Sequence, residues 1–147
     1  MNEGGKATWS SQQILSMLPH QFPFRFISNV TQYIPQRVLQ TEFTPSSQLP
    51  FLRFEYVPET VLIEGIAQTA VLLTQLETKP LVDGEVPLLG SVKMKVVKQV
   101  LWGKTILFEV EPVRTVGQQA VLKGKAFVES GTLITATVSV AVASKLK

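Results

Sequence analysis

The longest apolar stretch of the chain runs from 58 to 77, and it has the length and end signals of one helix. Pro58 suits the first helical position, and Glu59 suits the first turn, where the helix dipole favours negative charge. Pro80 lies just beyond the predicted end. Within the stretch VPETVLIEGIAQTAVLL, Glu64 is a carboxylate among apolar residues. An ionised carboxylate is costly to bury without partners, so its surroundings decide whether it faces water or serves chemistry.

The segments before this helix predict one short helix and two strands. Residues 10–18 offer serine caps and several apolar positions, and Pro19 then stops the helix. Residues 24–34 and 37–44 have the composition of strands, with a turn around Pro35-Gln36 between them.

From residue 88 onward the pattern changes to β-branched and partly alternating runs, separated by turn signals at glycine. These runs span 88–100, 105–116, 119–130 and 132–143, and we expect a four-stranded antiparallel meander. A long apolar helix among so many strands has to be covered by the sheet. The predicted fold class is therefore α+β, with a long central helix wrapped by an antiparallel sheet, which is the outline of a hot-dog fold.

The polar residues of the central helix fall on one side of it. Around an ideal helix, Gln68 and Gln75 lie within about 40° of Glu64, so the three form a narrow polar stripe. Periodicity alone favours a thin solvated stripe. Exposed helix faces usually carry both signs of charge, however, and this stripe has no lysine or arginine. That absence favours the alternative, in which the stripe lines a cleft or a subunit interface.

Composition indicates one globular domain. The 147 residues are 45% hydrophobic and 17% charged, which is typical of a packed core rather than of disorder. We expect a loose tail over 1–8 and a single domain over 9–147. The positive mean hydropathy of +0.21 also indicates that some apolar surface is buried against a partner subunit.

Several function classes are disfavoured by what the sequence contains. No apolar run reaches the roughly 18 residues of a membrane helix. The chain has no cysteine and one histidine, His20, which argues against cysteine-ligated and histidine-rich metal sites. A net charge of +3 without a dense basic block does not indicate nucleic-acid binding. The first ten residues show no secretion signal, so a cytoplasmic location is predicted.

Four lysines lie close together in the C-terminal half: Lys93, Lys95, Lys98 and Lys104. The solvated face of a strand is a sufficient explanation for them. The alternative is a weak docking surface for an acidic protein, because complementary charge speeds encounter.

Three segments resemble bacterial 3-hydroxyacyl-(acyl carrier protein) dehydratases of the FabZ type. LPHQFPFRFISNV resembles the L-P-H-x-[YF]-P-F opening of that family, and VPETVLIEGIAQTA resembles its second signature, a proline-led helix start running into L-I-x-E-x-x-A-Q. LLGSVKMKVVKQVLWGKTILFEV is similar to a later strand pair with a glycine and basic residues. The match covers 12 to about 143 in the same order, which supports the hot-dog prediction.

The resemblance implies a homodimer or a larger dimer-based assembly, with acyl tunnels at the dimer interface and neither metal nor organic cofactor. The implied substrate is a 3-hydroxyacyl thioester on acyl carrier protein or coenzyme A. Water is removed by a histidine of one subunit and a helix carboxylate of its partner, here Glu64. The helix start holds the thioester carbonyl through backbone N–H groups. The substrate-binding residues implied are His20, Phe22, Pro58, Glu59, Thr60 and Gln68.

The chain departs from the family where the catalytic histidine is expected. In the family this histidine stands in an H-F-P-G segment, fourteen residues before the helix carboxylate, and that position is Pro50 here. Proline cannot carry a proton. Glu59 also replaces a motif glycine at the helix start. His20 belongs to the first motif, and we favour local packing over a catalytic role for it.

Three functions stay open at this point. The first is a dehydratase or hydratase relative that retains Glu64 as acid or base. The second is a thioesterase, since other hot-dog families use a lone helix carboxylate as base or nucleophile. The third is a non-catalytic acyl-binding or assembly subunit that kept the fold and lost the reaction. The six clustered phenylalanines are expected in the core, some lining any acyl tunnel: Phe22, Phe24, Phe26, Phe43, Phe51 and Phe54.

Overall fold

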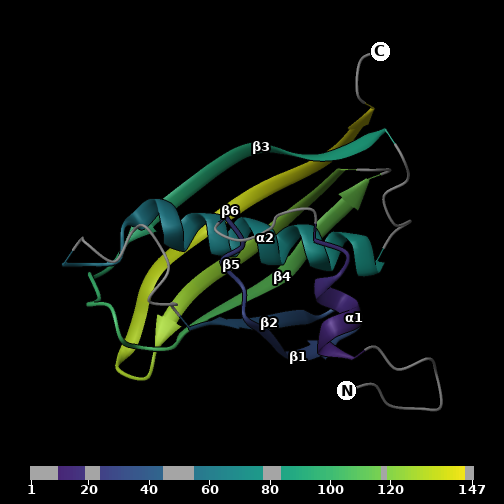
Figure 1. The fold of residues 1–147 in the computed structure, drawn as a ribbon. Helices are drawn as coiled ribbons and strands as arrows, with labels where there is room; N and C mark the ends of the chain where they lie inside the picture. Colours follow the sequence, from purple (N-terminus) through teal and green to yellow (C-terminus); the bar gives the residue numbers. More distant parts are fainter. Residues whose placement is uncertain (1–9, 19–23, 45–54, 78–83, 117–118, 145–147) are drawn as a thin grey trace.

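The chain folds into one antiparallel sheet with a long helix across one of its faces (Figure 1). The computed structural model describes residues 10–18, 24–44, 55–77, 84–116 and 119–144, so the predicted tail lies outside it. The helices are α1 (Ser11–Leu15) and α2 (Glu59–Glu77). The strands are β1 (Asn29–Ile34), β2 (Val38–Phe43), β3 (Glu85–Val96), β4 (Ile106–Val116), β5 (Gln119–Val128) and β6 (Gly131–Ser144). The α+β prediction is confirmed.

The order of the strands differs from the predicted meander. The sheet runs β1-β2-β4-β5-β6-β3, so of the four strands predicted as a meander only β4, β5 and β6 follow one another as hairpins. β3 pairs with β6 along its length, from Glu85 opposite Ser144 to Val96 opposite Ile134, and it never pairs with β4. After β3 the chain crosses to the middle of the sheet, where β4 pairs with β2. The prediction of a meander was wrong because it assumed that strands adjacent in sequence pair, as they usually do. The local sequence pattern does not reveal that β3 is an exception.

The predicted helix signals are largely confirmed. Ser10 caps α1, accepting from the Gln13 N–H at 3.0 Å while the Gln13 side chain accepts from the Ser10 N–H at 2.8 Å. Pro58 lies one residue ahead of α2, and its carbonyl accepts from Val61 and Leu62. The cap of α1 and the proline before α2 thus fix where both helices begin.

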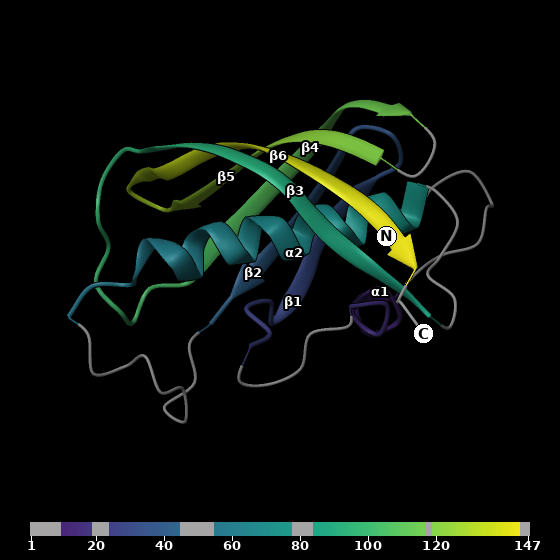
Figure 2. The same cartoon turned by 90° about the horizontal axis from the view of Figure 1, so that it is seen from above.

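α2 packs on β2, β4, β5 and β6, and the view from above shows strands passing across it (Figure 2). The closest approach is at Gly65, where a Cβ would lie 2.1 Å from the ring of Phe108, which is fully buried on β4. On β5, a Cβ at Gly124 would lie 2.5 Å from Ile66 of the helix. Glycine at both positions therefore lets the helix sit close to the middle of the sheet.

We expect Gly65→Ala to lower the free energy of unfolding by up to about 2 kcal/mol. Overpacking costs about 1–3 kcal/mol, and the better helix propensity of alanine returns about 1 kcal/mol. Urea unfolding measures the change. If the Phe108 ring is the cause, the loss should shrink when Gly65→Ala is made in a Phe108→Leu background. An equal loss in both backgrounds would contradict this explanation.

The last residue of α2 holds the turn between β1 and β2. The Tyr33 hydroxyl donates to one oxygen of Glu77 at 2.7 Å, and the Gln36 N–H donates to the other. Gln36 has a positive φ of 65°. Burial of the phenol, reinforced by the hydrogen bond to Glu77, raises the pKa of Tyr33 well above its ordinary value.

This contact predicts a stability that falls at alkaline pH. Because the pKa of Tyr33 is raised on folding, its contribution is fully present below about pH 10 and is lost as pH rises above the ordinary phenol pKa. Tyr33→Phe should lower the free energy of unfolding by about 1–2 kcal/mol at neutral pH and flatten its decline above about pH 10. Urea unfolding at about pH 8 and about pH 11 tests both. Parallel declines in the two proteins would contradict the prediction.

Candidate functional site

The polar stripe of α2 is mostly covered by the chain itself. Gln68 is 0% exposed and Gln75 is 5% exposed, whereas Glu64 keeps part of its surface accessible. A solvated stripe is therefore wrong for the two glutamines. The parts of the chain that cover them come from its N-terminal third.

Gln68 fastens the segment before β1 onto the helix. Its Nε2 donates to the Phe24 carbonyl at 2.7 Å, and its Oε1 accepts from the Phe26 N–H at 2.9 Å. The same Nε2 also donates to Oε1 of Glu64 at 3.2 Å. Backbone groups of an irregular segment need hydrogen-bond partners when they are buried. Here the side-chain amide of Gln68 satisfies one backbone carbonyl and one backbone N–H.

Gln75, nearer the C-terminal end of α2, also binds backbone of the N-terminal segment. Its Nε2 donates to the Met17 carbonyl at 3.0 Å, just after α1. The prediction that the stripe lines a cleft or a subunit interface is thus wrong for Gln68 and Gln75, which bind backbone of their own subunit. Residue types and spacing alone do not distinguish an amide that faces a ligand from one that faces the chain's own backbone.

Glu64 is the member of the stripe that can meet another molecule. It is partly exposed, and it accepts a hydrogen bond from an amide that two backbone contacts already hold in place. Beside it, Phe24 exposes 63% of its surface, although its own carbonyl is held by Gln68. The arrangement is a fixed, partly exposed carboxylate next to one exposed phenylalanine, which suits proton transfer on a largely apolar substrate.

The other predicted residues divide into two groups. Pro58 and Glu59 are partly exposed and Thr60 is exposed, all at the start of α2, within about two turns of Glu64. The helix start is tied to the crossover by the Val57 N–H, which donates to the Val100 carbonyl at 2.9 Å. His20, Phe22, Pro50, Phe51 and Phe54 lie outside the described residues.

Two features of this region were not predicted from the sequence. Phe24 is exposed rather than in the core, while Phe26 and Phe43 are buried edge to face, as expected. Trp102, after the bridge between Tyr56 and Leu101, has a buried indole N–H without an acceptor in the described part of the chain. No sequence signal separates Phe24 from Phe26, because the burial of Phe26 involves Phe43, which is distant in sequence.

The described residues contain neither a membrane-spanning helix nor a cluster of metal-ligating side chains. No helix of the described residues combines the length and the apolar character needed to cross a membrane. The described ranges likewise contain no cluster of three or more metal-ligating side chains.

Sequence comparisons connect the chain to dehydratases. No family model matches it. The coronafacic acid dehydratase of Pseudomonas savastanoi pv. glycinea is 28% identical over 109 residues, which cover 71% of this chain and 66% of that protein. The FabZ 3-hydroxyacyl-[acyl-carrier-protein] dehydratase of Oleidesulfovibrio alaskensis is 24% identical over 99% of this chain and 98% of its own length.

Structural comparisons establish the hot-dog fold. The dehydratase heterocomplex ApeI:P from Xenorhabdus doucetiae superposes with a TM-score of 0.75 at 16% identity, over 90% of this chain and 91% of that one. A thioesterase from Haemophilus influenzae gives a TM-score of 0.64 at 11% identity, over 97% and 96%. A hot-dog-like protein from Thermanaerovibrio acidaminovorans gives 0.58 at 20% identity, over 76% and 84%.

Proposed function

Because the chain is a divergent member of the FabZ-like dehydratase family with a hot-dog fold, we propose that it acts in the dehydration of 3-hydroxyacyl thioesters, with Glu64 as an acid/base group. One observation carries this proposal. Of the stripe on α2, Glu64 is the residue that stays partly exposed, and its carboxylate accepts a hydrogen bond from Gln68. The carrier is acyl carrier protein or coenzyme A. A cytoplasmic location stays a prediction.

The reaction asks for two proton transfers. One group removes a proton from C2 of the acyl chain, and one group protonates the C3 hydroxyl as it leaves. The bond from C3 to oxygen breaks, a double bond forms between C2 and C3, and water departs. Glu64 is suited to one of these transfers, since it is both accessible and fixed by Gln68.

The start of α2 is suited to the thioester carbonyl. The first N–H groups of a helix have no intrahelical acceptor, and the helix dipole favours negative charge at that end. Glu59 and Thr60 supply such N–H groups close to Glu64. The developing charge on the carbonyl oxygen would be stabilised there when the C2 proton leaves. The carboxylate of Glu59 acts against this and favours substrates without a negative charge nearby.

The second proton-transfer group does not come from position 50, which is Pro50. In the family it stands on the other subunit, so the proposed reaction needs a second hot-dog subunit. The sheet ends in β1 and β3, and β3, with 12 residues against 6, is the longer edge onto which such a subunit would add. The Xenorhabdus complex is a dehydratase heterocomplex, which gives a precedent for pairs of non-identical chains. The homodimer expected from the family stays a prediction.

A thioesterase is the second candidate. The observation in its favour is that the chain keeps a fixed helix carboxylate, Glu64, without the family histidine. Such a carboxylate can activate water, or attack the thioester itself, and release the thiol. The thioesterase structures share the fold alone at these identities, and the sequence relatives support dehydration as the first candidate.

Product analysis by mass spectrometry tests the proposal. The purified protein is incubated with a medium-chain 3-hydroxyacyl thioester on each carrier, with and without added imidazole, which replaces the group missing at position 50. Formation of the enoyl thioester supports dehydration. Free acid and thiol would move the protein to the thioesterases. Unchanged substrate on both carriers, with imidazole present, would overturn the proposal in favour of a non-catalytic acyl-binding or assembly subunit.

A further inference from the structure

The free edge of the sheet carries lysines that point away from the helix. A Cβ at Gly124 would meet Ile66 of α2, so the neighbours Lys123 and Lys125 project from the opposite, outer face. Residues directly opposite across a sheet share a face. The rows Lys123–Thr137–Lys93 and Lys125–Thr135–Lys95 therefore place Lys93 and Lys95 on the outer face of β3.

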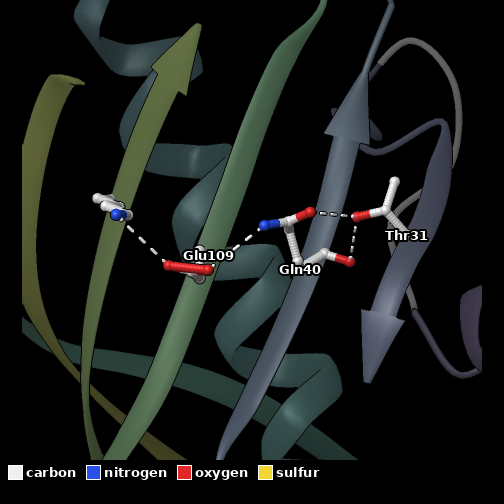
Figure 3. Close-up of polar contacts among 4 residues, drawn as sticks. Thr31, Gln40 and Glu109 are labelled. Carbon is white, nitrogen blue, oxygen red and sulfur yellow. Dashed lines mark hydrogen bonds and ion pairs between the residues drawn. The ribbon is translucent and has the colours of Figure 1, made fainter. Parts of the chain in front are cut away.

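Away from the edge, one row of the outer face satisfies its own polar groups. Thr31 and Gln40 are hydrogen-bonded at 2.9 Å, and the Gln40 amide donates to Glu109 at 3.3 Å (Figure 3). Lys125 completes this row with an ion pair to Glu109 at 3.5 Å. The polar row is thus continuous from β1 to β5.

At the edge this pairing stops. Lys93 and Lys95 are exposed and form no ion pair within the described residues, whereas Lys98 donates to Ser130 at 3.1 Å. They border a hollow of about 470 Å³ over β3, β6, β5 and β4. The other face of β3 is apolar and poorly covered, with Met94 50% and Val96 44% exposed. β3 is therefore a long edge with an apolar side, the usual template for adding another strand.

A second copy of this chain is a poor match for that edge. In a two-fold antiparallel pair centred on Met94, Lys93 of each copy faces Lys95 of the other. A pair centred on Lys93 or Lys95 places that lysine against itself. Centring on Val92 or Val96 leaves one lysine diagonal to its own copy, still within reach of a long side chain. Like charges opposite one another are destabilising, so each central register opposes self-pairing.

We propose that β3 is a docking edge for a non-identical strand that carries carboxylates opposite Lys93 and Lys95. The carboxylates of such a strand would form cross-strand ion pairs with the two lysines, where a second copy would bring lysine against lysine. The same strand would cover Met94 and Val96. The inference rests on the proposed function only for the need of a second subunit. The expected partner is a non-identical protein with an acidic edge strand.

A charge-reversed copy of the chain serves as the probe. The double variant Lys93→Glu, Lys95→Glu is mixed at low salt with nitrogen-15-labelled wild type, so that the dimers differ in mass, and species are counted by native mass spectrometry. The mixed dimer should form at least about tenfold more tightly than the wild-type homodimer, and the preference should fade with added salt. The matched control, Lys123→Glu, Lys125→Glu, makes the same change in the same two rows on an interior strand and should show no such preference.

Three outcomes would overturn the inference: a mixed dimer at no more than its statistical share, no mixed dimer at all, or an equal preference with the control variant. Circular dichroism confirms that each variant is folded before mixing. The readout is mass rather than turnover. A protein that pairs as expected but leaves the thioester unchanged, with imidazole present, would therefore refute the proposed function alone.

Discussion

Glu64→Gln should lower the rate of enoyl thioester formation by about 10²–10⁴-fold, the usual contribution of a general acid or base. The amide keeps the shape of the carboxylate and can still accept from Gln68, but it cannot carry the proton. The loss should appear in kcat, with KM little changed, because Glu64 acts on the reacting atoms rather than on binding. The free energy of unfolding should change by about 0.5 kcal/mol or less.

Glu129→Gln is the control for this experiment. Glu129 is an exposed carboxylate in the turn between β5 and β6, and its replacement changes the net charge by the same amount. Turnover should be unaffected. If Glu64→Gln and Glu129→Gln have equal activities, Glu64 takes no part in chemistry, and its burial and contacts are structural.

Gln68→Leu should have the largest effect on stability, lowering the free energy of unfolding by about 2–4 kcal/mol. The change removes the acceptor of the Phe26 N–H and the donor to the Phe24 carbonyl, and leucine can replace neither. Leaving a buried backbone group unsatisfied costs about 1–3 kcal/mol. The midpoint of urea unfolding measures the loss, provided that the slope of the transition stays the same.

Gln75→Leu provides a matched comparison on the same helix and the same stripe. It is also buried, but it makes a single described hydrogen bond, to the Met17 carbonyl. Its loss should cost about 1 kcal/mol. Equal losses in the two variants would mean that Gln68 contributes only as a buried side chain, without the bridging role between Phe24 and Phe26.

Local patterns carried most of the fold. The helix over Glu59–Glu77, the short capped helix and all six strands follow from periodicity, caps and turn residues, because these depend on neighbours in sequence. Glu64 also stood out locally, as a charge in an apolar helix. The family resemblance then supplied its chemistry, and it identified Pro50 as the break from the pattern.

Long-range contacts limited the rest. The place of β3 beside β6 depends on a crossover, and the burial of Gln68 depends on where residues 24–26 lie, far away in sequence. The exposure of Phe24 beside the buried Phe26 has the same origin. None of these leaves a periodic trace, since each is set by which distant backbone group meets which side chain.

The crossover at β3 also has a consequence for the order in which a ribosome delivers the fold. β3 is complete once Val96 has been made, yet its partner begins only at Gly131, after two further strands have emerged. Until β6 is made, β3 has no strand to pair with and its apolar face stays exposed. Pairing between strands far apart in sequence is slow, and this delay leaves a nascent chain open to aggregation. Lys93 and Lys95, exposed on β3, are charges of the kind that oppose the joining of such strands from two chains before β6 is made.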